Sequence, residues 1–303
     1  MDQEIKISYI TTTKNKIPYL KNRMEKLLAQ KIGDEEILVA DGASADGTKE
    51  YLEELKKKGG IDFYSSEPDY GESHALNKLF LIARGELIKI ITDDDVFSYE
   101  SVLACKKFML EHPEIDLIGS EGGSQNKDME SIVSDDPLEY VRAINYSNNY
   151  RQWQKNHTPF SFCGLGIMFR RSSLPVIGLW NLSFRAADAE FSFRTTAGKA
   201  NIAWYTGYSF INVSNPKSVS LVYKNKIKNE MDRLNKFYLN KDPDSLLVEK
   251  MRAIKNKIYG LFRYGQKKPK MMFQQKFQEI TEIGEKWLEI KNRQKKPEFI
   301  WKK

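Results

Sequence analysis

The sequence predicts an α/β fold: a mostly parallel sheet flanked by helices, followed by a basic and mainly helical C-terminal extension. Two observations support this prediction. Apolar, β-rich runs alternate with helix-like segments from residue 5 to residue 205, which is the pattern of a parallel sheet with helices on both faces. Beyond about residue 216 the chain becomes lysine-rich and helix-prone. The 303 residues, 41% of them hydrophobic, suffice for one large domain with an appendage.

The first half of the predicted sheet has the most regular pattern. Residues 5–10 alternate and are β-branched, and residues 17–30 carry apolar side chains at helical spacing. Asp46 and Thr48 are candidate caps for the second helix. We expect strands at 5–10, 36–40, 61–65 and 86–91, and helices at 17–30, 48–58 and 73–83.

The second half alternates less clearly. We expect helices at 98–111 and 187–197, and strands at 115–119, 161–170 and 201–205. Residues 121–157 are polar, without clear periodicity, so we expect an irregular stretch there. Such a stretch inside a compact domain is usually functional or mobile.

Charge divides the chain into two parts, which we place at residues 1–215 and 216–303. From Lys217 to Lys303 there are 23 Lys and Arg against 10 Asp and Glu, a net charge of +13, whereas residues 1–216 carry −6. A basic extension suits nucleic acid, anionic lipid or a polyanionic substrate, or is simply a solvated helical surface. The sequence contains neither a long apolar run nor a charged-then-apolar start, so we expect no membrane span and no signal peptide.

Carboxylates follow two of the predicted strands. Asp41 ends one apolar run, and Asp93, Asp94 and Asp95 end another. Ligands of open α/β sheets bind at the carboxyl ends of strands. Three adjacent negative charges call for a cation, and a hard divalent metal that also holds a phosphate meets that need. The alternative is a solvated acidic turn. The glycines form neither a dinucleotide fingerprint nor a P-loop, which excludes those two classes.

Several segments, in this order, resemble the family 2 glycosyltransferases of GT-A fold. Each segment alone is weak evidence, but the ordered set is specific and spans residues 5–205. The segments are Ile7–Asn15, Val39–Thr48, Ser66–Gly71, Ala75–Lys78 and Ala83–Ile88, the last leading into Thr92–Asp95. Nothing comparable marks the last 90 or so residues.

The resemblance implies a set of donor-binding residues. Small hydroxyls at the end of the first strand would contact the nucleoside, and Asp41 would accept a hydrogen bond from the base or ribose. Asp69 and Asn77 are further candidates near the donor. The complete set of candidates for the nucleotide sugar is Thr11, Thr12, Thr13, Asp41, Asp69, Asn77, Asp93 and Asp94.

The acid triplet has the position of the family's Asp-X-Asp element. There, Asp93 would face the ribose, Asp94 would bind Mn²⁺ or Mg²⁺, and Asp95 would be a second ligand or a support. The metal would neutralise the charge that develops on the departing diphosphate.

The segment from Arg185 to Arg194 resembles the family's late acidic motif. Asp188 takes the position of the general base, with Glu190 as the alternative two residues later. A purely structural interpretation is that Asp188 caps a helix, which stabilises it by about 1 kcal/mol. Nearby Trp180 can stack on a sugar or pack in the core.

We therefore expect an inverting, metal-dependent hexosyl- or N-acetylhexosaminyltransferase. The donor would be a nucleotide-diphosphate sugar, UDP favoured, and the acceptor a saccharide or lipid-linked saccharide in surface polysaccharide synthesis. Two alternatives are a catalytically silent nucleotide-sugar or polysaccharide-binding protein and a nucleotidyltransferase. The latter usually has a glycine- and basic-rich first loop, which this sequence lacks. No nucleic-acid partner is expected.

The extension mixes aromatic residues with Lys and Arg, which describes either a basic surface lying on anionic lipid or helices packed on the first domain. The two distant cysteines, Cys105 and Cys163, suggest reduced thiols in a cytoplasmic protein, and the lipid interpretation, which we favour, adds a peripheral position on the inner membrane face. The packing interpretation would bury an apolar stripe that consists of Phe273, Phe277, Ile280 and Trp287.

Overall fold

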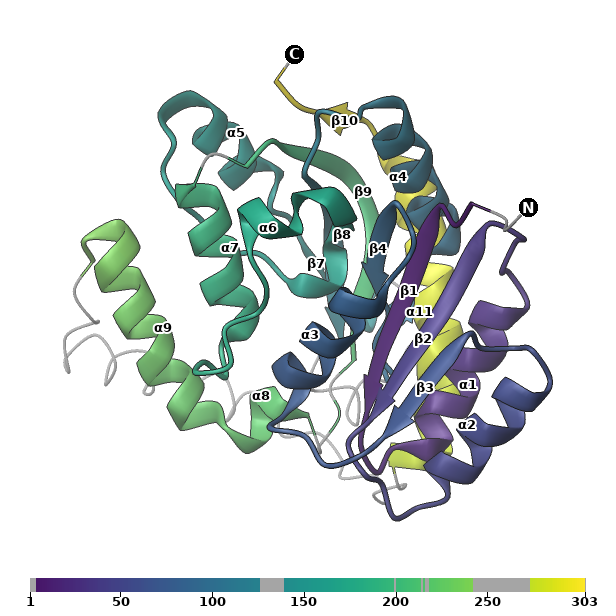
Figure 1. Cartoon of the computed structure of the whole chain (residues 1–303). Helices are drawn as coiled ribbons and strands as arrows, with labels where there is room; N and C mark the ends of the chain where they lie inside the picture. The colour runs from purple at the N-terminus through teal and green to yellow at the C-terminus, as the bar shows by residue number, and fades with distance from the viewer. Residues whose placement is uncertain are drawn as a thin grey trace.

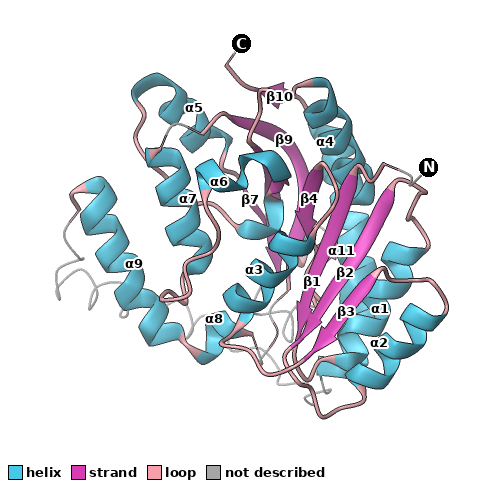
Figure 2. Cartoon of the chain, in the orientation of Figure 1, coloured by secondary structure: helices cyan, strands magenta, loops and turns pink. Residues whose placement is uncertain are grey.

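The computed structural model describes residues 4–125, 139–198, 200–213, 215, 218–241 and 273–302. In this part of the chain ten strands form one mixed sheet with helices on both faces (Figures 1 and 2). The strands are β1 (Ile7–Thr13), β2 (Glu35–Asp41), β3 (Phe63–Ser66), β4 (Leu87–Ile90), β5 (Val96–Phe97), β6 (Leu117–Gln125), β7 (Val141–Ile144), β8 (Met168–Arg170), β9 (Ile202–Asn212) and β10 (Phe299–Ile300).

The strand order is β10-β9-β6-β8-β4-β1-β2-β3, with β5 paired to β9 and β7 to β6. Strands β1 to β4 run parallel to their neighbours among themselves, and Thr13 lies opposite Asp41 at the ends of β1 and β2. Strand β8 lies antiparallel between β4 and β6, while β6 and β9 are again parallel. The predicted α/β class is confirmed, and the polar strand ends meet at one edge of the sheet.

The longer helices cover the two faces of the sheet. Helices α1, α2, α4 and α11 cover one face; α3, α5, α6 and α7 cover the other (Figure 1). Their bounds are α1 (Ile17–Leu28), α2 (Thr48–Lys57), α3 (Glu72–Ile82), α4 (Tyr99–Glu111), α5 (Ser147–Asn156), α6 (Leu174–Ile177), α7 (Ala187–Ala197), α8 (Val219–Val222), α9 (Lys224–Leu239) and α11 (Phe273–Lys295). Two short 3₁₀ turns, Gly164–Gly166 and Arg171–Ser173, flank β8.

Helix α1 illustrates why the sequence pattern predicted these elements. Pro18 lies in its first turn, where the missing N–H has no helical partner to lose. Leu20, Met24 and Leu27 follow at helical spacing and are buried against the sheet. The second helix begins after Gly47, and Asp46 accepts hydrogen bonds from the main-chain and side-chain groups of Thr48.

The prediction of an irregular stretch over residues 121–157 was wrong where the structure describes regular elements, at 121–125, 141–144 and 147–156, and its part at 126–138 lies outside the described residues. Strand β6 continues to Gln125, and β7 and α5 lie within the range. The extra length of β6 depends on glycine: a Cβ on Gly122 would lie 2.2 Å from the ring of Phe210. The predicted strand at 161–170 is short, because a 3₁₀ turn occupies Gly164–Gly166.

The last described segment packs against the sheet. Phe277, Ile280 and Trp287 of α11 are buried, and β10 pairs with β9. The packing interpretation is therefore confirmed for these residues; residues 242–272 and the Phe273 side chain lie outside the described part. None of the described helices is long and apolar enough to cross a membrane.

Candidate active site

The ends of β1 and β4 bring the predicted nucleotide-binding residues together. The hydroxyl of Thr13 donates a 2.8 Å hydrogen bond to Asp93. The ammonium of Lys16, at the start of α1, lies 3.0 Å from Asp93 Oδ1 and 2.8 Å from Asp94 Oδ2. Because Lys16 bridges the two carboxylates, the cation that three adjacent acids require is partly supplied by the chain itself.

The segment that follows β9 contacts two acids of the triplet, Asp94 and Asp95. Asn215 Nδ2 donates a 2.7 Å hydrogen bond to Asp94. The carboxylate of Asp95 accepts hydrogen bonds from the Thr92 hydroxyl and the Val213 main-chain N–H, each 2.7 Å long. All three acids are buried. Burial raises the pKa of Asp93 and Asp95, and the neighbouring Asp94 carboxylate raises both further, so the triplet favours a nearby positive charge.

The acids suit a divalent cation that shares its coordination with substrate. No group of three or more His, Cys, Asp or Glu converges as a complete metal site within the described residues. Mg²⁺, however, is usually held by one or two carboxylates together with substrate phosphates. Asp94, at the centre of the triplet, fits the role of a ligand, whereas both oxygens of Asp95 already bind protein groups.

The remaining donor candidates lie around this cluster but have different surroundings. Thr11 and Thr13 are buried and Thr12 is half-buried, and it is the Thr13 hydroxyl that bonds an acid of the triplet. The buried Asp41 carboxylate holds the loop after β2 through Ser44 and accepts a 2.6 Å hydrogen bond from Ser66.

Two further candidates make structural contacts. Asp69 accepts a 2.8 Å hydrogen bond from the Gly71 N–H, just before α3. The side-chain amide of Asn77 bonds the main-chain O and N–H of Trp180, at 2.9 and 3.0 Å. Asn77 thus ties α3 to the segment before α7. The Trp180 ring is buried in the core, which confirms the packing interpretation.

Asp188 lies in the first turn of α7 and faces the 3₁₀ turn before β8. Its Oδ2 accepts a 2.8 Å hydrogen bond from the Gly164 N–H, and the Cys163 thiol lies 3.9 Å away. Water reaches the side chain, yet the surrounding protein raises the pKa of its carboxyl. Asp188 does not cap α7. Instead, Glu230 of α9 accepts hydrogen bonds from the N–H groups of Arg185 and Ala186, both 2.7 Å long.

Glu190 has a different environment from Asp188. Two residues along a helix correspond to a rotation of about 200°, so the side chains of Asp188 and Glu190 face nearly opposite sides of α7. The Glu190 carboxylate is buried and forms a two-point ion pair with Arg194 at 2.9 and 3.2 Å. An acid held in this way is a poorer candidate for accepting a proton than Asp188.

Glu72, the first residue of α3, links the two acidic groups electrostatically. The pKa of its carboxyl is raised to about 7, first by the surrounding protein and then by the negative charge of Asp188. Lys16 partly offsets this shift and Asp94 adds to it. The charges of Asp94 and Asp188 thus both act on Glu72, and a Cβ on Gly71 would lie 2.6 Å from Arg185 Nη1, so the start of α3 lies beside the segment that precedes α7.

Sequence reasoning missed four groups in this site: Lys16, Asn215, the Gly164 N–H and Glu230. The requirement for a cation was recognised, but the lysine that supplies one was not. Main-chain donors such as Gly164 have no residue pattern, and Glu230 acts from a helix in the basic extension. Only the folded chain brings these groups to the acids.

The family is established by comparison with known proteins. The protein-family model described as "Glycosyl transferase family 2" matches residues 8–177 of the sequence. The chain belongs to this family. A poly-beta-1,6-N-acetyl-D-glucosamine synthase of Staphylococcus epidermidis is 21% identical to this family 2 chain over 189 residues. The alignment covers 62% of the chain and 45% of that relative, so the chain spans about half the length of the curated relatives it matches.

Solved structures share the GT-A fold of this family 2 chain. One is TarS of S. aureus, residues 1–349, in complex with UDP-GlcNAc: its TM-score is 0.56 at 18% identity, covering 79% of this chain and 68% of that chain. Another is the mannosyltransferase PcManGT from Pyrobaculum calidifontis in complex with GDP-Man and Mn²⁺. Its TM-score is 0.55 at 17% identity, covering 78% of this chain and 65% of that one. At these identities the likeness shows the fold.

Proposed function

We propose that this chain transfers a sugar, with inversion, from a nucleotide-diphosphate donor to a saccharide or lipid-linked saccharide acceptor. The observation that carries the proposal is the pairing of two acidic groups in one site. The Asp93–Asp95 triplet lies at the strand ends, Asp188 lies at the start of α7, and Glu72 interacts with both groups.

On the donor side, Thr13 and Asp93 would bind the ribose, and their mutual 2.8 Å hydrogen bond fixes both side chains. Asp94 would hold Mn²⁺ or Mg²⁺, with Asp95 as its support. When bound, such a cation stabilises the negative charge of the leaving diphosphate. Lys16 lies at the same carboxylates and adds positive charge there.

On the acceptor side, Asp188 would take the proton from the attacking hydroxyl. The Gly164 N–H fixes one carboxylate oxygen, leaving the other to face the acceptor. A raised pKa makes the ionised carboxylate a stronger base. One base without a second carboxylate nucleophile suits a single displacement, which inverts the anomeric centre.

The relatives' names support the donor class and the product. A UDP-GlcNAc complex and a GDP-Man complex are among the fold neighbours, and a curated relative is named as a polysaccharide synthase. We therefore favour a UDP-sugar and a role in polysaccharide synthesis.

Thermal unfolding with UDP or GDP, each with Mn²⁺ or with chelator, tests the proposal. A nucleotide at 100 times its Kd stabilises the fold by about 2.7 kcal/mol. Stabilisation should require the metal and should disappear in Asp94→Ala, while Glu279→Ala, an exposed acid on α11, should behave as wild type. Equal stabilisation in excess chelator would remove the metal from the proposal.

A further inference from the structure

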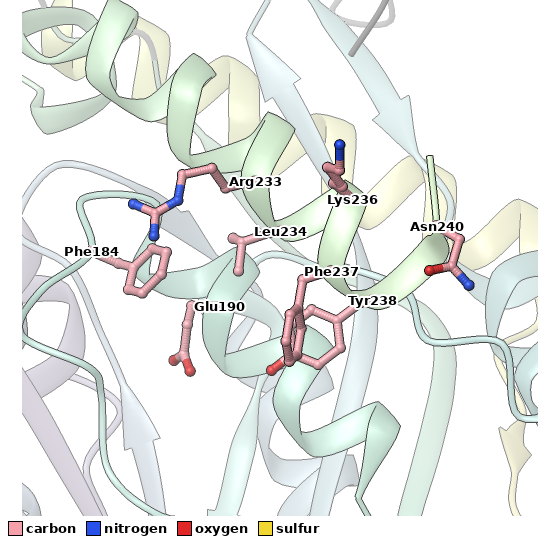
Figure 3. A pocket seen from close by; sticks show the side chains of 8 residues that line it. All are labelled: Phe184, Glu190, Arg233, Leu234, Lys236, Phe237, Tyr238 and Asn240. Carbon is pink, nitrogen blue, oxygen red and sulfur yellow. The ribbon is translucent and has the colours of Figure 1, made fainter. Parts of the chain in front are cut away.

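A groove lies between α7 and α9, on the side of α7 that carries Glu190 (Figure 3). Its volume is about 690 Å³, within the usual range for ligand sites. Phe184 lines it from the segment before α7, whereas Arg233, Lys236, Phe237 and Tyr238 line it from α9.

An aromatic wall forms one side of this groove. Tyr238 stacks on Phe193 of α7, with ring centroids 5.4 Å apart and an interplanar angle of 5°. Phe237 stands edge-on to Tyr238 at 4.9 Å, and its side chain is 78% exposed. A large ring that is held by packing but left open to water offers a flat apolar surface, such as the apolar face of a sugar ring can cover.

The charge that the groove offers to a ligand is positive. Arg233 lies one helical turn before Phe237 and is exposed; no ion pair between described residues involves it. Lys236 also lines the groove. The acid of this surface, Glu190, is neutralised by Arg194 at 2.9 Å. A guanidinium with no carboxylate partner suits a phosphate or carboxylate.

The groove begins near the start of α7, the helix that carries the candidate base. Phe184 precedes α7 by three residues, and Figure 3 shows Phe184 and Arg233 toward one end with Phe237 and Tyr238 farther along. Asp188 lies in the first turn of the same helix. Glu190 lines the groove from the side of α7 opposite Asp188, so an acceptor longer than its reacting sugar would reach the groove by passing around the start of α7, where Phe184 lies.

We propose that the α7–α9 groove binds the non-reacting part of an anionic acceptor glycan, one whose repeats carry phosphodiester or carboxylate groups. A sugar ring covers Phe237 while Arg233 pairs with the anionic group. This inference rests on the proposed glycosyl transfer and specifies the class of acceptor for it.

Titration calorimetry on the full chain, without donor, tests the groove directly. The probes are a polyglycerol phosphate chain, hyaluronan and neutral dextran. One of the two anionic polymers should bind, and dextran should bind at least tenfold more weakly. The better anionic polymer identifies the group as phosphodiester or carboxylate.

Variants locate that binding. Arg233→Gln and Phe237→Ala should each weaken it about tenfold, because a charge-assisted hydrogen bond or a covered ring contributes on that order. Both side chains are exposed, so neither change threatens folding. Arg293→Gln, which removes a cation from α11, and Leu81→Ala, which removes an exposed apolar side chain from α3, should bind as wild type.

Dextran binding as tightly as both anionic polymers, or wild-type affinity in Arg233→Gln and Phe237→Ala, would overturn the proposal. The proposed chemistry fails differently. If the wild-type chain binds the anionic polymer at the groove but no nucleotide diphosphate, the fault lies with the transfer reaction and the groove stands.

Discussion

The carboxylate of Glu230 accepts a 2.7 Å hydrogen bond from the main-chain N–H of Ala186, the N-cap residue directly before α7. A second bond of the same length reaches the Arg185 N–H. The first N–H groups of a helix have no partner within it, and a negative charge there is favourable. A residue from the basic extension thus completes the helix that presents Asp188.

Replacing Glu230 with alanine should therefore affect catalysis as well as stability. One buried and one part-buried N–H group lose their acceptor, which should lower the free energy of unfolding by about 1–3 kcal/mol. kcat should fall because Asp188 is less well held, while nucleotide affinity should change little. Urea unfolding, turnover and nucleotide titration measure the three effects. Asp232→Ala on the same helix is the control, and equal behaviour of the two variants would contradict the role of Glu230.

The regular half of the fold was predictable because its information is local. Apart from the two-residue strand β5, which was not predicted, the elements from β1 to α4 begin and end within three residues of their predicted bounds, since apolar spacing and strand-end acids lie in the sequence itself. The extension of β6 beyond the predicted end at residue 119 was not predictable. Its Gly122 and Gly123 are strand residues because Phe210 and Val141 fill the space that side chains would occupy.

The residues of the candidate site also fall into those that the sequence suggested and those that only the folded chain identifies. Asp93, Asp94 and Asp188 were found from residue type and order. Lys16 bonds Asp94 across 78 positions, and Asn215 bonds it across 121. A lysine or asparagine is ordinary in either context, so only tertiary structure identifies these two. The same holds for the Gly164 N–H, which every residue except proline could supply.

The pH dependence of Asp188→Asn tests the base. A base works ionised, and the pKa of Asp188 is raised, so wild-type kcat should climb with pH through that raised pKa and then level off. Asparagine cannot accept the proton, so kcat of the variant should be about 10²–10⁴-fold lower. The rise of kcat with pH should also disappear. Nucleotide affinity, measured by titration, should hardly change.

The raised pKa of Asp188 also predicts the direction in which Asp188→Asn changes the free energy of unfolding. A carboxyl with a raised pKa ionises less readily in the folded chain, so its charge disfavours folding at neutral pH. Asp188→Asn should therefore leave the free energy of unfolding unchanged or higher. Near-normal turnover in Asp188→Asn, with collapse in Glu190→Gln, would transfer the base to Glu190.

Gly164→Ala should disturb Asp188 without touching its charge. A Cβ at residue 164 would lie 2.6 Å from Asp188 Oδ1, closer than such atoms approach, so the carboxylate must move. kcat should fall by at least tenfold, since small misplacements of reacting groups are costly. Gly60→Ala is the control, because its nearest neighbour is 3.4 Å away. Normal turnover in Gly164→Ala would show that the position of Asp188 is not critical.

Lys16→Met should tighten metal binding in the absence of nucleotide. The Lys16 ammonium lies 2.8 Å from Asp94 Oδ2, so it competes for the carboxylate that we assign to the metal. Without it, the repulsion between Asp93 and Asp94 is relieved only by an added cation. Mn²⁺ titration followed by electron paramagnetic resonance measures the affinity. Asp94→Ala should bind less Mn²⁺, and unchanged or weaker binding in Lys16→Met would refute the competition.

Membrane docking must be tested without removing the extension. Helix α11 contributes Phe277, Ile280 and Trp287 to the core. Truncation at residue 216 would expose their apolar partners on β9 and cause aggregation, so it would not report on membrane binding. Charge substitutions on α9 avoid this difficulty. Lys224 and Lys228 are exposed on this helix. Lys57 on α2, in the acidic part that precedes the extension, is an exposed lysine that serves as the control.

The full chain should co-sediment with anionic vesicles but not with neutral ones. Each lysine near an anionic surface contributes about 1 kcal/mol, and the attraction falls off within a Debye length. Binding should therefore weaken as salt is raised, and the double change Lys224→Gln and Lys228→Gln should weaken it further at constant salt. Lys57→Gln should have no effect. If wild-type protein stays in the supernatant with anionic vesicles at low salt, the basic charge of the extension serves the anionic acceptor instead of a lipid surface.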